Sequence, residues 1–70
     1  MKMIMRIYTN DGTIWEFDLE QSFIEYGVDR MTIARKDNPD EFVILFASMI
    51  VGIEQREQSD TESISWGTSD

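Results

Sequence analysis

Residues 2–20 read KMIMRIYTNDGTIWEFDLE and form two alternating runs on either side of a turn. Apolar and charged residues alternate with a period of two in both runs, which is the pattern of a half-buried β-strand. The turn contains Asn10-Asp11-Gly12, and a glycine after an aspartate adopts the left-handed conformation of a tight turn at no steric cost. The sequence therefore predicts a β-hairpin. Its second strand is expected to point Trp15, Phe17 and Leu19 inward and Glu16, Asp18 and Glu20 outward.

Three further strands are predicted, at residues 28–36, 42–46 and 49–56. Residues 42–46 are apolar at every position, which is typical of a central strand buried on both sides. Ser22 and Glu25 have the spacing of a helix capping box, and a glycine soon afterwards can end a helix. At most one short helical turn is therefore expected, within residues 21–28.

The composition changes at Gln58. The last thirteen residues contain four Ser, two Thr, three acids and no base, with few apolar side chains. Such a segment cannot bury enough apolar surface to offset the entropy of ordering it. We therefore expect one folded domain over residues 1–57 and an acidic, Ser/Thr-rich disordered tail over residues 58–70; a chain of 70 residues leaves no room for a second domain.

The stretch 43–53, VILFASMIVGI, resembles the second signature of the Sm-like proteins, in which a buried strand, a short turn and a final strand follow one another. Asn10-Asp11-Gly12-Thr13 is loosely similar to the first signature. The resemblance implies an all-β fold, a small five-stranded bent meander or barrel of SH3-like or Sm-like type. Curling the sheet removes its edges and encloses one thin core. The family's RNA-contacting basic pair would stand at Phe46 and Ala47, so RNA binding does not carry over to these residues.

Several chemistries are disfavoured by the composition. The chain has no His, no Cys and a net charge of −8, so the commonest general base, the thiolate nucleophile and the Cys-based zinc site are absent. We expect no enzyme activity, no cofactor and no metal site. The three acids Asp37, Asp40 and Glu41 do not match a calcium loop, and we interpret them as a solvated turn.

The charge and the apolar runs also bear on partners and location. An acidic surface disfavours phosphate backbones and anionic lipids, so direct nucleic-acid binding and membrane binding are not expected. The longest apolar run has about ten residues, half of what a bilayer requires. The absence of Cys fits a reducing compartment, and a cytoplasmic location is expected.

Two groups of side chains are candidates for partner binding. Alternate acids on one strand stand about 6.8 Å apart and form a row of negative charge. With neighbouring acids they define a predicted acidic face, and apolar residues on the nominally outer side define a predicted apolar patch. The acidic face consists of Asp11, Glu16, Asp18, Glu20, Glu25 and Asp29, and the apolar patch of Ile4, Tyr8, Ile14 and Tyr26.

These features favour a non-catalytic, acidic protein-binding module whose protein partner has a basic surface. Small bacteriophage or mobile-element proteins that inhibit or modulate a host protein have this style of sequence. Two alternatives remain open at this point. The chain could be a nucleic-acid mimic that blocks a nucleic-acid-binding enzyme, or a self-assembling Sm-like ring subunit that forms a homo-oligomer.

Overall fold

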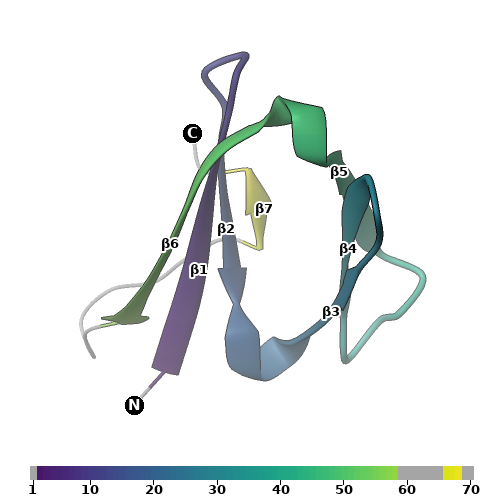
Figure 1. Cartoon of the computed structure of the whole chain (residues 1–70). Helices are drawn as coiled ribbons and strands as arrows, with labels where there is room; N and C mark the ends of the chain where they lie inside the picture. Colours follow the sequence, from purple (N-terminus) through teal and green to yellow (C-terminus); the bar gives the residue numbers. More distant parts are fainter. Residues whose placement is uncertain (1, 59–65, 69–70) are drawn as a thin grey trace.

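The computed structural model describes residues 2–58 and 66–68. Within them the chain forms two small antiparallel sheets that face each other (Figure 1). One sheet has the strand order β6-β1-β2-β7 and the other β3-β4-β5. The strands are β1 (Lys2–Thr9), β2 (Ile14–Asp18), β3 (Ser22–Tyr26), β4 (Arg30–Arg35), β5 (Phe42–Phe46), β6 (Ile50–Gln58) and β7 (Gly67–Thr68), with 3₁₀ turns η1 (Leu19–Gln21) and η2 (Ala47–Met49).

The predicted all-β class is confirmed, but the predicted single bent meander or barrel of five strands is wrong, because the described residues form two separate sheets and no closed barrel. The described residues contain six strands of five residues or more, together with the short β7. The strands form two separate sheets because the chain crosses from one to the other through η1 and returns through η2, and no ladder joins β5 to β6 (Figure 1).

The predicted hairpin is confirmed. β1 and β2 pair antiparallel with Met5 opposite Phe17 and Ile7 opposite Trp15. Gly12 has a φ of +87°, the left-handed conformation that the turn requires. The Asp11 carboxylate accepts hydrogen bonds from the Thr9 hydroxyl and the Thr13 N–H, at 2.6 and 3.0 Å, and these bonds hold the pKa of Asp11 below its usual range.

The predicted helical turn lies elsewhere. Residues 22–26 form β3, which pairs along its whole length with β4, and the 3₁₀ turn η1 precedes it. Asp18 caps η1 by accepting the Glu20 N–H at 3.0 Å. The Ser22 hydroxyl donates backward to the Asp18 carbonyl at 2.7 Å instead of capping a helix that follows it. A second 3₁₀ turn, η2, connects β5 to β6 at the place where the Sm-like resemblance implied a short turn, although only one helical turn was expected in the chain.

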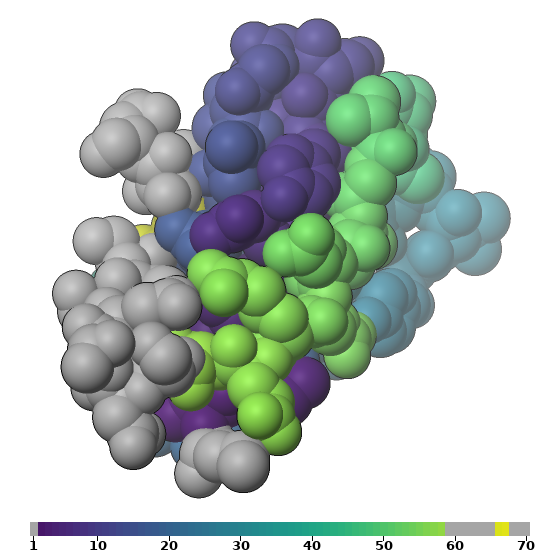
Figure 2. All heavy atoms as spheres, turned by 90° about the vertical axis from the view of Figure 1, so that its left-hand side faces the viewer, coloured from purple at the N-terminus to yellow at the C-terminus, as the bar shows by residue number. Residues whose placement is uncertain are grey.

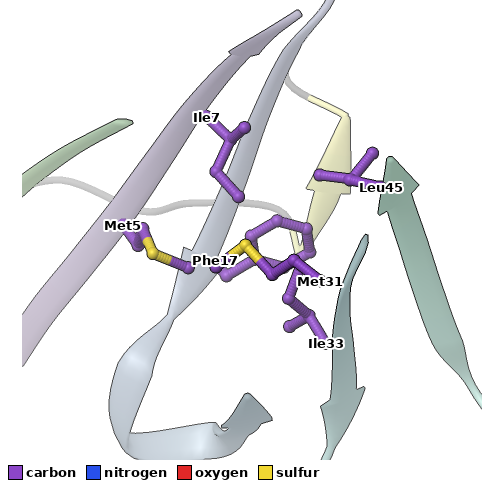
Figure 3. Close-up of a cluster of buried hydrophobic side chains, with 6 residues drawn as sticks. All are labelled: Met5, Ile7, Phe17, Met31, Ile33 and Leu45. Carbon is purple, nitrogen blue, oxygen red and sulfur yellow. The ribbon is translucent and has the colours of Figure 1, made fainter. Parts of the chain in front are cut away.

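The core lies between the two sheets. Met5, Ile7 and Phe17 point into it from one sheet, and the second sheet contributes three more side chains from the opposite side (Figure 3). All six are buried, and Phe17 is fully enclosed, as its inward position in the alternation predicts. The three contributed by the second sheet are Met31, Ile33 and Leu45.

β5 is not buried on both sides as predicted. It forms an edge of the three-stranded sheet, with Leu45 in the core and Phe42, Ile44 and Phe46 exposed on the opposite face. An all-apolar strand looks the same in sequence whether its second face is covered or open, so the pattern did not distinguish the two cases.

The expected disordered tail is also corrected where the structure describes it. Gln58 is the last residue of β6, and Gly67–Thr68 pair with β2 as β7. The Trp66 ring lies edge-on to the Phe17 ring with centroids 5.0 Å apart, so the packed body extends beyond residue 57. Residues 59–65 and 69–70 lie outside the described residues.

Candidate functional site

The three-stranded sheet has one face in the core and one face toward solvent. Because Met31, Ile33 and Leu45 point inward (Figure 3), the alternate residues of the same strands point outward. The outward cross-strand sets are Phe23–Ala34–Phe42, Glu25–Thr32–Ile44 and Arg30–Phe46. We call Phe23, Phe42, Ile44 and Phe46 the outer apolar face.

These four side chains are strongly exposed for their size. Phe23 is 58% exposed, Phe42 54%, Phe46 44% and Ile44 41%. Together they present roughly 400 Å² of apolar surface, a size at which the largest patch on a soluble monomer is often functional. Thr32 and Ala34 lie between them on β4, so the two sides of the face carry large side chains and its middle carries small ones.

A cation stands over an aromatic ring at each end of β4. The Arg30 guanidinium lies 5.5 Å from the Phe46 ring centroid, and the Lys36 ammonium lies 5.4 Å from that of Phe23. Such contacts contribute about 0.5–1 kcal/mol at exposed sites and orient the rings. Arg30 also pairs with Asp29 at 3.1 Å, and this hydrogen bond lowers the pKa of the Asp29 carboxyl.

Sequence reasoning missed this face for two reasons. Phe23 fell within the expected helical turn, and residues 42–46 were expected to be covered on both sides. A signal was present, because Arg30, Thr32, Ala34 and Lys36 give β4 one polar or small face. A polar face on the central strand indicates that the aromatic residues beside it are not enclosed.

The predicted acidic face is not an exposed row. Glu16 and Asp18 are only 6% and 9% exposed. Arg6 Nη2 lies 2.8 Å from Glu16 Oε2, and Lys2 Nζ lies 3.6 Å from Asp18 Oδ2. The hydrogen bond that the Arg6 guanidinium donates to the Glu16 carboxylate raises the pKa of Arg6 above its usual value.

The hairpin register explains this result. Arg6 is directly opposite Glu16, and the outward residues of β1 and β2 share one sheet face, so bases and acids meet there. The turn at Asn10-Asp11-Gly12 fixes this register, and the pairing could have been found from the sequence. Glu16 and Asp18 thus point away from the core as predicted, but they form cross-strand ion pairs, and the solvent exposure predicted for them is wrong.

The other four predicted acids are exposed but are not gathered. Asp11 lies in the β1–β2 turn and Glu20 in η1, at opposite ends of the molecule (Figure 1). Glu25 lies on the outward side of β3, and Asp29 precedes β4 beside Arg30. Glu25 and Asp29 therefore adjoin the outer apolar face.

The predicted apolar patch is also not assembled. Ile4 is fully buried, with Asp18 and Arg56 opposite it on the neighbouring strands. Tyr8 and Ile14 face each other across the hairpin and are half-buried. Tyr26 is 69% exposed, but it belongs to β3 in the other sheet.

β6 provides a second exposed apolar region. It is the longest strand described and lies at the edge of its sheet, paired with β1, and it crosses the face turned to the viewer in Figure 2. Val51 and Ile53 on this strand are exposed. Within residues 2–58 and 66–68 no strand pairs with the outer edge of β6, and an open edge of this length is a template for another strand.

Metal binding finds no support within residues 2–58 and 66–68, where no group of three or more acids could hold an ion. Two of the acids in the 37–41 turn instead pair with Arg35, Asp37 at 3.3 Å and Glu41 at 3.4 Å. Among the described elements there is also no helix with the length and apolar character to cross a bilayer.

Comparison with family models, with curated proteins and with solved structures found no significant match. The surface geometry is therefore the basis for assigning a function.

Proposed function

We propose that this chain is a non-catalytic protein-binding module that docks through the outer apolar face. The observation that carries the proposal is the exposure of Phe23, Phe42, Ile44 and Phe46 on one side of one sheet. Each ring costs free energy while it stays in water, and a partner that covers the face removes that cost. Aromatic side chains of this kind dominate the energetics of protein interfaces.

The occupant of this face is a protein with apolar side chains at its centre and basic residues at its margin. Residues 2–58 contain eleven acids and six bases, so the body attracts a basic surface. Glu25 and Asp29 place negative charge beside the outer apolar face. A module of this size acts by covering a surface on its partner, and we extend the proposal to inhibition or modulation of a host protein in the cytoplasm.

The connectivity supports the small-barrel resemblance as part of the same proposal. β2 and β3 are separated by η1 alone and contribute to the two different sheets. β6 follows β5 after the 3₁₀ turn η2 and returns to pair with β1. An SH3-like or Sm-like arrangement has this strand order, although no ladder joins β5 to β6 in this fold.

The test compares two double variants with the native chain. Phe42→Ser with Phe46→Ser removes two rings from the face, and Val28→Ser with Val51→Ser removes two exposed apolar residues elsewhere. Circular dichroism establishes that both are folded. A partner captured from lysate and then purified should bind the native chain and the control equally, and the face variant at least tenfold more weakly.

Equal affinity for all three chains would contradict the proposal. If the partner is basic as proposed, its association rate with the native chain also falls as salt is raised, because steering by opposite charge is screened.

Self-assembly is a second candidate, favoured by the β6 edge with its exposed Val51 and Ile53. A homo-oligomer, such as a ring, would be detected by sedimentation equilibrium and disrupted by Val51→Lys with Ile53→Lys. A constant monomer mass at all concentrations would exclude it. Nucleic-acid mimicry has no comparable observation behind it, since Glu16 and Asp18 are held by Arg6 and Lys2.

A further inference from the structure

Trp66 occupies a site between the two sheets, away from the outer apolar face. Its ring meets Phe17 edge-on, with centroids 5.0 Å apart and planes inclined by 75°. Its indole Nε1–H donates to the Ser22 hydroxyl oxygen at 2.9 Å. The Arg35 guanidinium lies 5.7 Å from the ring centroid. An aromatic wall, a hydrogen-bond acceptor and a cation thus surround one indole.

The acceptor specifies which side chain fits. The Ser22 hydroxyl donates its hydrogen to the Asp18 carbonyl at 2.7 Å, so it presents lone pairs to the Trp66 site. Ser22 is 7% exposed, and a buried acceptor left without a donor is costly. The site therefore favours tryptophan, whose ring carries an N–H donor, over phenylalanine or leucine, which have no donor.

The backbone conformation at position 67 requires glycine. Gly67 has a φ of +113°, a conformation that other residues adopt only with strain. A Cβ built on Gly67 meets no atom within 4 Å, so conformation and not space selects glycine. From this point the chain runs antiparallel to β2, with Gly67 opposite Glu16 and Thr68 opposite Trp15.

We infer that the edge of β2, together with the Trp66 site, is a binding site for an extended peptide that carries Trp-Gly. The chain's own residues 66–68 occupy the site in this structure. Backbone pairing to a sheet edge combined with one anchoring side chain is how β-strand addition recognises peptides. This site is separate from the outer apolar face and does not depend on the function proposed for it.

The occupant is held by few contacts. β7 has two residues, and local opening of so short a strand requires less free energy than unfolding the sheets. A tethered segment has an effective concentration on the order of millimolar, so a free peptide with the same contacts competes weakly with it. Binding should therefore be clearest when Trp66 itself is removed from an otherwise full-length chain.

The experiment uses the full-length Trp66→Ala chain and the blocked peptide Ser-Trp-Gly-Thr. Nuclear magnetic resonance of the ¹⁵N-labelled protein follows the amides of Phe17 and Ser22. Saturable shifts at these positions are expected. The peptide Ser-Phe-Gly-Thr should bind about tenfold more weakly because it leaves the Ser22 acceptor unpaired. The peptide Ser-Trp-Ala-Thr should lose about fivefold or more through backbone strain.

Two further measurements keep the inference testable. If Trp66→Ala does not fold, Trp66→Leu replaces it in the titration, because leucine keeps apolar volume at this position. If neither variant folds, addition of the Trp-Gly peptide must restore the native spectrum of the protein. In the native chain, the Trp66 indole hydrogen should exchange with solvent faster than the amides of β1. Three results would each overturn the inference. The three peptides could bind equally, the Trp-Gly peptide could neither bind nor restore the fold, or the indole hydrogen could exchange only through global unfolding.

Discussion

Glu16→Lys should destabilise the fold strongly, although the alternation of β2 would place this residue in solvent. Its carboxylate contacts Arg6 at 2.8 Å, and the side chains of Arg6 and Glu16 are 27% and 8% exposed. Removing one partner of a fully buried pair costs about 3–5 kcal/mol, and exposed pairs contribute about 0–1 kcal/mol. The partly exposed Arg6 places Glu16→Gln between these limits, at about 1–2 kcal/mol.

The lysine variant adds repulsion between two cations, and we expect a cost of about 3 kcal/mol. A chain of 70 residues has a free energy of unfolding of about 3.5–10 kcal/mol, so this change removes a large fraction of it. The Tm should fall by about 15 °C. Thermal and urea unfolding at pH 7, followed by circular dichroism, measure the effect.

Glu20→Lys is the matched control, because Glu20 is exposed on η1 and the charge change is the same. Its effect should stay within about 0.5 kcal/mol. Exchanging the charges, with Arg6→Glu and Glu16→Arg together, should recover part of the lost stability. If Glu16→Lys and Glu20→Lys unfold at the same temperature, the ion pair has no structural role, and Glu16 belongs to a solvated row after all.

Three further predictions follow from the core, the C-terminal contact and the first turn. Phe17→Ala should cost about 3–5 kcal/mol in urea unfolding, because Phe17 is fully enclosed between the sheets; a neutral result would place it outside the core. Trp66→Ala should lower the free energy of unfolding by about 2–4 kcal/mol, whereas a disordered tail would lose nothing. The pKa of Asp11 is depressed below its usual 3.8, so its contribution to stability is complete above about pH 4 and is lost as the pH falls through its folded-state pKa. Asp11→Ala should therefore differ from the native chain in Tm at pH 6 and should converge with it in strong acid; a constant difference down to pH 2 would show that the carboxylate is not involved.

The local pattern was sufficient for the first hairpin. Asn10-Asp11-Gly12 defines a tight turn, and the two runs beside it alternate strictly, so the pairing and the inward position of Phe17 follow from neighbours in the chain. The same register also implies the contact between Arg6 and Glu16. The exposure of the acidic row was predicted wrongly because the alternation was considered one strand at a time.

The candidate site could not be found in this way. Residues 42–46 are apolar at every position, and their pattern is compatible with burial on both sides or on one. The open side is determined by what packs against it, and in this fold β5 lies at a sheet edge with Phe42, Ile44 and Phe46 uncovered.

The position of Trp66 could not be predicted from the local sequence pattern either, because its contacts are with residues far away in the chain. Its indole binds Ser22, which lies 44 residues earlier, and its ring packs against Phe17. Turn propensity and strand alternation act between residues that are close in the chain, and both are visible in the amino-acid order. The partial burial of Trp66, the exposure of the outer apolar face and the closure of the core depend on contacts between distant segments, and the free energy of these contacts exists only once the two sheets have come together.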